Sequence, residues 1–269
     1  MALHDAGHDA GHDAETPGAH AATRQQDAPG WVGFWNRPNA IYVNRRNLEA
    51  HFASLQRDLD AYLPAGGTVL DFGCGEALAA DAMAERCGSL LLYDAAPAVR
   101  ERLAERFHGH PRIKVLTDDD LAALPQGSVD LVLAVSVLQY IPRAELVAVL
   151  RRWRGLLNAT GRALIADVVD PRTPMLRDVT SQLAMARRNG FLMAALVGLG
   201  RLALSDYRRI RREAGFSAYT PEELRGLLAE AGLHAAPLPH NVGPTPHRHS
   251  FLARPVRQAA EEEPALKVQ

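Results

Sequence analysis

The chain has 269 residues, of which 47% are hydrophobic and 23% are charged, and its formal net charge is −1. This composition is typical of one globular domain with appendages, and the near-neutral charge gives no general electrostatic basis for nucleic-acid binding. The longest strongly apolar run, residues 191–199, is too short to cross a bilayer as a helix. Only two cysteines are present and no secretory signal opens the chain, so we expect a reducing, cytoplasmic location.

Both ends of the chain are predicted to be disordered. Residues 1–29 contain the repeat HDAGHDAGHDA and almost no large apolar side chains. Such a segment buries too little surface to offset its ordering entropy, and loose metal chelation by its histidines is the alternative interpretation. Residues 255–269, which end in EEEPALKVQ, also indicate a disordered tail. We therefore expect one folded domain over residues 30–254.

Strand-like and helix-like patterns alternate through the first part of this domain. Apolar runs rich in Val, Leu and Ile predict strands at residues 68–71, 90–94, 113–116, 131–136 and 163–169. Amphipathic spacing predicts helices at residues 78–86, 98–108 and 143–157, with Gly161 as the stop signal of the last helix. This alternation predicts a doubly wound, mostly parallel α/β sheet whose ligand lies at the carboxyl ends of the strands.

The pattern changes after residue 169. Residues 171–216 have a mostly helical pattern and lie where such a fold inserts a substrate cover. The segment TPEELRGLLAEAGL then predicts a helix with Thr220 as its N-cap and Pro221 at its first position. Residues 234–238 and 250–253 predict a C-terminal antiparallel hairpin.

The predicted helical cover carries nine arginines against three acids, and its centre, FLMAALVGLGRLAL, is apolar on most faces. A helix of this kind must be buried or face a ligand, a partner or a membrane surface. Four interpretations stay open: packing against the domain, a lid over an apolar or anionic small molecule, a homodimer face, and a peripheral membrane contact. Gly198 and Gly200 lower helix propensity and permit a bend. The chain is a monomer or a homodimer on these interpretations.

The stretch LDFGCGEA places Asp71 directly before a Gly-x-Gly turn. In a dinucleotide site this turn approaches a pyrophosphate, which an acid at that position would repel. S-adenosylmethionine (SAM) carries an ammonium and a sulfonium instead, and Asp71 would attract both. Gly73 and Gly75 would let the backbone pass close to the cofactor. Asp94 ends the next predicted strand, where an acid accepts hydrogen bonds from ribose hydroxyls; surface loop acids are the alternative.

These motifs resemble those of the class I SAM-dependent methyltransferases, in particular their small-molecule, type 11-like group. The resemblance is carried by DFGCGEA, YDAAP, VDLVLAVSVLQYIP and LLNATGRALIADVV, and TPEELRGLLAEAGL extends it towards the C-terminus. Ala77 departs from the pattern, because the family commonly has a third glycine there. The resemblance implies SAM as cofactor, S-adenosylhomocysteine (SAH) as product and a small, partly apolar molecule as substrate.

The resemblance also implies which residues line the cofactor. It implies Asp71, Gly73, Cys74 and Gly75 at the methionine end, Asp94 at the ribose, Ala95, Asp120 and Leu121 at the adenine, and Ser136 and Gln139 beside the methyl group. The acidic run at residues 118–120 leaves the position of the adenine acid open by one or two residues.

The segment GFWNRPNAIYVNRRNLEAHF precedes the sheet and resembles the N-terminal region of a bacterial subgroup of these enzymes. On that basis Tyr42 and Arg46 are expected to close over the cofactor, and an ordinary packing helix with solvated arginines is the alternative. Methyl transfer depends mainly on holding the nucleophile about 3 Å from the methyl carbon, so the sequence names no catalytic residue. Tyr140, Tyr207 and His51 are the candidates.

The segment PHNVGPTPHRH offers three histidines whose spacing fits no standard zinc site, so we expect no metal there. A general base near the substrate and solvated loop histidines are the other interpretations. An NAD(P)-dependent oxidoreductase is disfavoured by Asp71 and by the absence of a Tyr-x-x-x-Lys pair, and a non-methylating SAM-binding protein stays open. Nucleic-acid methylation is disfavoured because the fourth strand ends in SVLQYIP rather than in the Asn/Asp-Pro-Pro-Tyr/Phe motif.

Overall fold

The computed structural model describes residues 30–36, 55–188, 215–243 and 245–256. The predicted tail at residues 1–29, most of the tail at residues 255–269, and residues 189–214 of the predicted cover lie outside the described residues. The last strand runs to Pro255, one residue beyond the predicted domain boundary at 254. The backbone N–H of Val256 then donates to the carbonyl of Gly232 at 2.9 Å, which ties this end of the chain to the domain.

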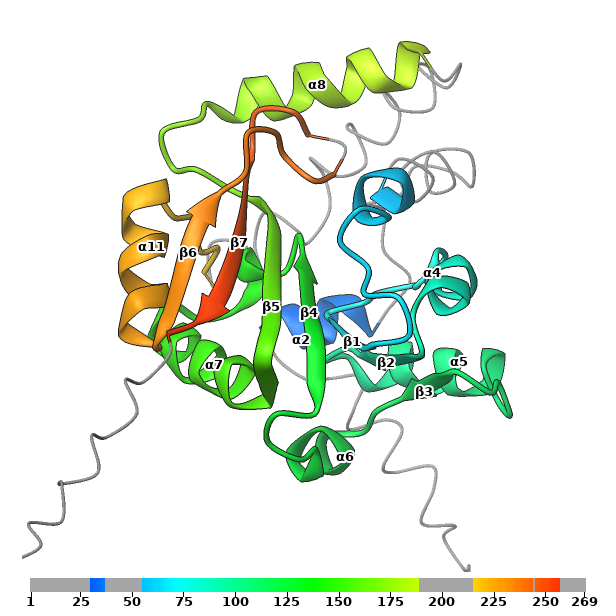
Figure 1. Cartoon of the computed structure of the whole chain (residues 1–269). Helices are drawn as coiled ribbons and strands as arrows, with labels where there is room; N and C mark the ends of the chain where they lie inside the picture. Colours follow the sequence, from blue (N-terminus) through cyan, green and yellow to red (C-terminus); the bar gives the residue numbers. More distant parts are fainter. Residues whose placement is uncertain (1–29, 37–54, 189–214, 244, 257–269) are drawn as a thin grey trace, which may run out of the picture.

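The core of the protein is a seven-stranded sheet with the strand order β3-β2-β1-β4-β5-β7-β6 (Figure 1). Strands β1 to β5 are parallel, and β7 runs antiparallel to both β5 and β6. This arrangement confirms the predicted doubly wound, mostly parallel sheet and its C-terminal antiparallel hairpin. The strands are β1 (Thr68–Phe72), β2 (Ser89–Tyr93), β3 (Ile113–Val115), β4 (Val129–Val135), β5 (Leu157–Val168), β6 (Leu233–Pro237) and β7 (His249–Pro255).

Helices cover both faces of the sheet (Figure 1). Alternate residues of β4 belong to two separate apolar clusters, one shared with α7 and α11 and the other with α4 and α5. This explains why the strand is apolar at nearly every position, since both of its faces are buried. The helices are α2 (Gly30–Trp35), α4 (Ala80–Arg86), α5 (Pro97–Arg106), α6 (Asp118–Ala123), η1 (Leu138–Tyr140), α7 (Arg143–Leu156), α8 (Met175–Arg188) and α11 (Pro221–Glu230).

The junction between α7 and β5 differs from the prediction. Strand β5 begins at Leu157, directly after α7, because Leu157 pairs with Val129 before the register shifts. Gly161 therefore lies inside the strand and does not stop the helix, so that prediction was wrong. A Cβ atom on Gly161 would lie 3.0 Å from both the Val129 carbonyl oxygen and the Asn158 nitrogen. The glycine is required for close backbone approach at this irregularity.

Helix α6 was not predicted, because six residues are too few to show an amphipathic period. Its start has a sequence signature all the same. Thr117 accepts a hydrogen bond from the Asp120 N–H and Asp120 accepts one from the Thr117 N–H, which together form a capping box. The same device, with Thr220 and Glu223, begins α11 where the sequence predicted a helix.

Helix α8 is the described part of the predicted cover. It lies beyond the carboxyl end of β5 (Figure 1), and Ser181 Oγ lies 3.2 Å from His247 Nδ1 in the loop between β6 and β7. Among the described residues, no helix combines the length and the apolar character that crossing a membrane requires.

Candidate functional site

The chain leaves β1 through a glycine turn that is tied to the end of β2. The N–H groups of Gly73 and Cys74 both donate to the Tyr93 carbonyl, at 2.7 and 3.1 Å. Gly73 has φ +78°, and a Cβ atom there would collide with Val137 in the loop after β4. Gly75 has φ +55° and no atom within 4 Å of its would-be Cβ, so the turn leaves open space beside it. At Gly73, only glycine combines the positive φ angle with the absence of a Cβ that Val137 requires.

The side chain of Asp94, which follows β2, also holds this turn in place. Its Oδ2 accepts from the Gly75 N–H at 3.0 Å, and its Oδ1 accepts from the Ala96 N–H at 2.9 Å. Burial raises the pKa of Asp94, and the two backbone hydrogen bonds partly offset that rise. A carboxylate has about four acceptor positions, so roughly two remain for hydroxyl donors from a ligand. Ala95, the next residue, is exposed.

Asp71 is the last residue but one of β1 and pairs in register with Leu92 and Leu133. Burial, with a smaller contribution from the charge of Asp94, raises the pKa of Asp71 to about 7. Among the described residues, no hydrogen bond or ion pair reaches its carboxylate. The same burial and the same two acids raise the pKa of the Cys74 thiol well above its ordinary value, so this thiol stays protonated and unreactive.

Two acids of the run after β3, Asp118 and Asp120, have different partners. Asp120 completes the α6 capping box and pairs with Lys114 Nζ at 2.8 Å, and these bonds lower its pKa. Asp118 accepts from the Tyr93 hydroxyl at 2.8 Å and pairs with Arg100 Nη2 at 2.8 Å. Asp118 therefore lies beside the end of β2, whereas the carboxylate of Asp120 is occupied by its own helix. Leu121 is buried, and the adenine roles of Asp120 and Leu121 stay predictions.

The ends of β4 and β5 carry a strained polar pair that the sequence did not reveal. Ser136 and Asp167 both have left-handed backbones, with φ +55° and +59°. Such conformations cost on the order of 1–3 kcal/mol each in residues other than glycine and are concentrated at functional sites. Ser136 Oγ donates to Asp167 Oδ2 at 2.5 Å, and the buried Gln139 donates through Nε2 to the Ser136 carbonyl at 2.7 Å.

The Asp167 carboxylate is fully compensated by the loop between β6 and β7. Arg248 Nη1 lies 2.7 Å from Asp167 Oδ2, and Asn241 Nδ2 donates to Oδ1 at 3.0 Å. The Asp167 side chain is only 4% exposed and that of Arg248 only 16%. The histidines of this segment drew attention to it in the sequence, but the residues that contact Asp167 are Asn241 and Arg248.

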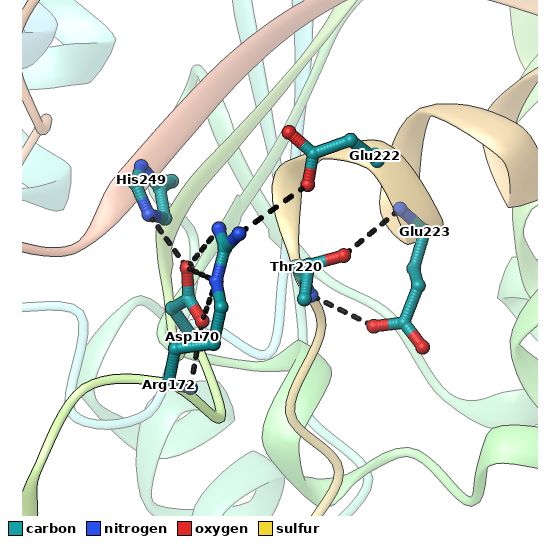
Figure 2. A network of polar contacts seen from close by, with 6 residues as sticks. All are labelled: Asp170, Arg172, Thr220, Glu222, Glu223 and His249. Atoms are coloured by element: carbon teal, nitrogen blue, oxygen red, sulfur yellow. Dashed lines mark hydrogen bonds and ion pairs between the residues drawn. The ribbon is translucent and has the colours of Figure 1, made fainter.

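A second compensated acid anchors the start of the predicted cover (Figure 2). Asp170 accepts from Arg172 Nε at 3.0 Å and Nη2 at 2.7 Å, and His249 Nε2 lies 3.2 Å from its Oδ2. Arg172 also reaches Glu222 at the start of α11, at 3.8 Å. These bonds lower the pKa of Asp170 to about 2. Within the described ranges, no group of three potential ligands could hold a metal ion.

Aromatic rings line the approach to the β4 end. Tyr140 lies 4.8 Å from Trp31 and 5.6 Å from Trp35, both on α2, and 6.1 Å from Phe216, measured between ring centres. Directly after this short helix, Asn36 Oδ1 accepts from the Ala98 N–H at 3.1 Å, at the start of α5. The α2 segment thus links the loop after β4 to the helix after β2.

Four of the predicted site residues lie outside the described residues, so the structure says nothing about their positions. They are Tyr42, Arg46, His51 and Tyr207.

Comparison with known sequences identifies methyltransferases. A family model described as a methyltransferase domain matches residues 70–163. The ubiquinone biosynthesis O-methyltransferase of Xanthomonas axonopodis pv. citri is 28% identical over 175 residues, which cover 63% of this chain and 64% of that protein. An uncharacterised methyltransferase of Mycobacterium tuberculosis is 31% identical over 148 residues, which cover 53% of this chain and 71% of that protein. The match thus spans less than two thirds of the Xanthomonas protein's length.

Solved structures show the same fold at low sequence identity. The DhpI–SAH complex superposes with a TM-score of 0.54 at 14% identity, covering 89% of this chain and 99% of that chain. The 1,6-didemethyltoxoflavin-N1-methyltransferase of Burkholderia thailandensis superposes with a TM-score of 0.51 at 18% identity, covering 92% and 94% of the two chains.

Proposed function

Because the chain belongs to the class I, Rossmann-like SAM-dependent methyltransferases, we propose that it transfers the methyl group of SAM to a small, partly apolar molecule. The observation that carries the proposal is the pair of half-buried acids, Asp71 and Asp94, at the glycine turn. Both have raised pKa values, and neither carboxylate is paired with a cation in the described chain. A ligand that brings an ammonium, a sulfonium and ribose hydroxyls would supply what both acids lack.

The proposed cofactor contacts follow from this geometry. Asp94 would accept hydrogen bonds from the ribose, and Asp71 would face the cationic methionine end across the turn at Gly73 and Gly75. For the adenine, the position of Asp118 beside the β2 end supports this residue over Asp120. Ser136 and Gln139, at the end of β4, would lie beside the transferred methyl group.

The proposed acceptor is apolar in part because aromatic rings surround the end of β4. Tyr140, Trp31 and Trp35 provide planar apolar surface where the acceptor would lie. The Xanthomonas relative is named for O-methylation, which makes a hydroxyl-bearing acceptor the first class to test among O, N and C nucleophiles. The protein would act by positioning the nucleophile in line with the methyl group, which requires no dedicated base. The two free cysteines fit the reducing cytoplasm as its location.

The first experiment measures cofactor binding. SAM and SAH should raise the melting temperature, whereas NAD and NADP should leave it unchanged because Asp71 would repel a pyrophosphate. Asp94→Ala should weaken SAH binding by about 2–4 kcal/mol, or roughly 30- to 1000-fold, because it removes charge-assisted hydrogen bonds to the ribose. Asp81→Ala is the matched control, since that acid pairs with Arg106 on the surface of α4. Wild-type affinity in Asp94→Ala would remove the ribose assignment.

The second experiment looks for methyl transfer. Methyl-labelled SAM is incubated with the protein and with fractions of small-molecule extracts, and labelled products are identified by mass spectrometry. Label in an organic-soluble molecule supports the proposal. Tight SAM binding with no label transfer from any fraction would instead support a non-methylating SAM-binding protein.

A further inference from the structure

Ser136, the residue after β4, is held in place by three hydrogen bonds. Its N–H donates to the Ala166 carbonyl at 3.1 Å, and its own carbonyl accepts from Gln139 Nε2 at 2.7 Å. Its Oγ donates to Asp167 Oδ2 at 2.5 Å. The backbone of Ser136 has φ +55°, a left-handed conformation that is unfavourable for residues other than glycine. The fold therefore keeps a serine at a strained position and holds its hydroxyl in one orientation.

The Ser136 hydroxyl can only accept hydrogen bonds from a ligand. A serine hydroxyl has one donor and two acceptor positions, and an ionised carboxylate has acceptors alone. The donor of Ser136 is committed to Asp167, and Arg248 Nη1 lies 2.7 Å from the same Oδ2. Ser136 is half-buried, and among the described residues no other hydrogen bond reaches its Oγ. Both lone pairs of this oxygen are therefore available to a ligand that brings a donor.

The loop that carries Ser136 borders the glycine turn. The strand order of the sheet reverses between β1 and β4, and in open α/β sheets the ligand lies beyond the carboxyl ends of the strands at such a point. A Cβ atom on Gly73, in the turn after β1, would collide with Val137, the neighbour of Ser136. The two segments are therefore in contact. A cofactor with its methionine end at the glycine turn would place its methyl group close to Ser136.

Aromatic rings follow Ser136 in the same part of the site. Tyr140 lies on η1, four residues further along the chain, and its ring centre lies 4.8 Å from that of Trp31 and 6.1 Å from that of Phe216. Aromatic faces favour other planar rings, in offset or edge-to-face contact. A planar ring that packs against this cluster would present a substituent to the Ser136 hydroxyl.

We propose that Ser136 selects a planar aromatic acceptor with a neutral hydroxyl group, by accepting the hydrogen bond of that hydroxyl. The proposal rests on the proposed function, because it takes the methyl group of SAM to lie at the glycine turn. A ring that carries a methyl group instead of the hydroxyl would leave the Ser136 lone pairs without a donor, and the site should discriminate against it. The same hydrogen bond would hold the acceptor oxygen beside the methyl carbon, with a lone pair free to attack.

Asp167 is a positioning residue in this arrangement, because it acts through Ser136. In Asp167→Asn, the new amide group can donate to Ser136 Oγ, and the serine hydroxyl can then turn its own donor towards the ligand. The preference for a hydroxyl-bearing ring should weaken in this variant, although the aromatic surface is unchanged. A purely structural role for Asp167 would instead lower the affinity for all aromatic ligands alike.

The test measures the binding of 2-naphthol and 2-methylnaphthalene, which have nearly the same shape, to the SAH-loaded protein by ligand-observed NMR. The methyl compound is the more apolar, so the readout is the change in the ratio of the two affinities from wild type to variant. Ser136→Gly should move this ratio roughly tenfold towards 2-methylnaphthalene, because glycine adopts the same φ freely and only the hydroxymethyl group is lost. Asp167→Asn should move it about threefold.

Ser128→Ala is the matched control, since this serine precedes β4 and its Oγ donates to the Pro125 carbonyl at 2.7 Å. The ratio of the two affinities should stay at its wild-type value in this variant.

The ratio decides the outcome. An equal change of affinity for both probes in Ser136→Gly, with the ratio unchanged, would overturn the proposal. Binding of neither probe by the SAH-loaded wild type would also overturn it, and the proposed function would stand because SAH binding is measured first. Failure of the wild type to bind SAH would overturn the proposed function as well. If Ser136→Gly does not fold, Ser136→Ala provides the same comparison. An unchanged ratio in Asp167→Asn would remove the positioning role of Asp167.

Discussion

Acids that are buried or half-buried lie at two places on the carboxyl edge of the sheet, and only one of the two groups is paired with arginines. At the β1–β2 end, the pKa values of Asp71 and Asp94 are raised by burial, and no side-chain cation is paired with either carboxylate in the described chain. At the β4–β5 end, Asp167 is paired with Arg248 and Asp170 with Arg172, each at 2.7 Å. The two ends lie on adjoining strands of one sheet, so the difference comes from what surrounds each acid.

The difference between the unpaired and the paired acids indicates where a cationic ligand would bind. Burying a carboxylate without a partner is costly, and a fold keeps such a group where a bound ligand completes it. The β1–β2 end therefore calls for a cation and hydroxyl donors, which matches SAM. The acids at the β4–β5 end are already paired with arginines, so they leave no unmet charge for a ligand to satisfy.

The largest effect on stability is expected from removing an acid at the β4–β5 end, where the acids are paired with arginines. Asp167→Ala would leave Arg248 buried without its carboxylate and should lower the free energy of unfolding by about 3–5 kcal/mol. Asp71→Ala, at the uncompensated end, should leave this free energy unchanged or raise it at neutral pH, because it removes a costly buried charge. Urea titration of both variants measures the difference. Equal destabilisation by the two substitutions would contradict the comparison.

A smaller effect is expected in the pH dependence of binding. Because the folded-state pKa of Asp71 is about 7 and its ordinary value is 3.8, the cofactor-free protein binds an extra proton between these pH values and loses stability as the pH rises through them. A cationic ligand requires the ionised form, so SAH affinity should rise about fivefold from pH 6 to pH 7. At more alkaline pH it should fall again, as the amino group of the ligand loses its charge.

Asp71→Asn separates the two limbs of this profile. The variant should bind SAH more weakly at pH 7 and lose the acidic limb, while the alkaline limb, which belongs to the ligand, remains. Calorimetry from pH 5.5 to pH 9 provides the measurement. An unchanged acidic limb in the variant would show that another group titrates, and tighter binding at pH 7 would refute the electrostatic role of Asp71.

The smallest effect concerns backbone strain beside the uncompensated acids. Ala77, which stands where the family commonly has glycine, has φ +45° and is buried. Ala77→Gly should relieve about 1–2 kcal/mol of strain, partly offset by the greater entropy of glycine in the unfolded chain, for a net gain of about 0.5–1 kcal/mol. The matched control is Ala79→Gly, at φ −90°, which should destabilise the protein by a similar amount. A loss of stability in Ala77→Gly, measured by thermal unfolding, would remove the strain interpretation.

The sequence by itself determined the features that depend on near neighbours along the chain. The alternation of apolar and amphipathic segments predicted the doubly wound sheet and its C-terminal hairpin, because both periodicities are local. The acid before the glycine turn and Asp94 at the end of the second strand were also readable, since both belong to one strand–helix–strand unit. The N-cap at Thr220 followed from the capping preference of its side chain.

Only the tertiary structure decided the features that join distant segments. The pairing of Ser136 with Asp167 spans 31 residues and that of Arg248 with Asp167 spans 81 residues, and no spacing in the chain indicates either. The different surroundings of Asp118 and Asp120 likewise depend on Tyr93 and Arg100, which reach only Asp118. The sequence predicted Gly161 to be a helix stop, whereas the structure shows that glycine is required there because the Val129 carbonyl approaches closely. The physical reason is common to all three: the partner of a buried polar group or of a close-packed backbone is chosen by proximity in the folded chain, and a one-dimensional pattern carries no such information.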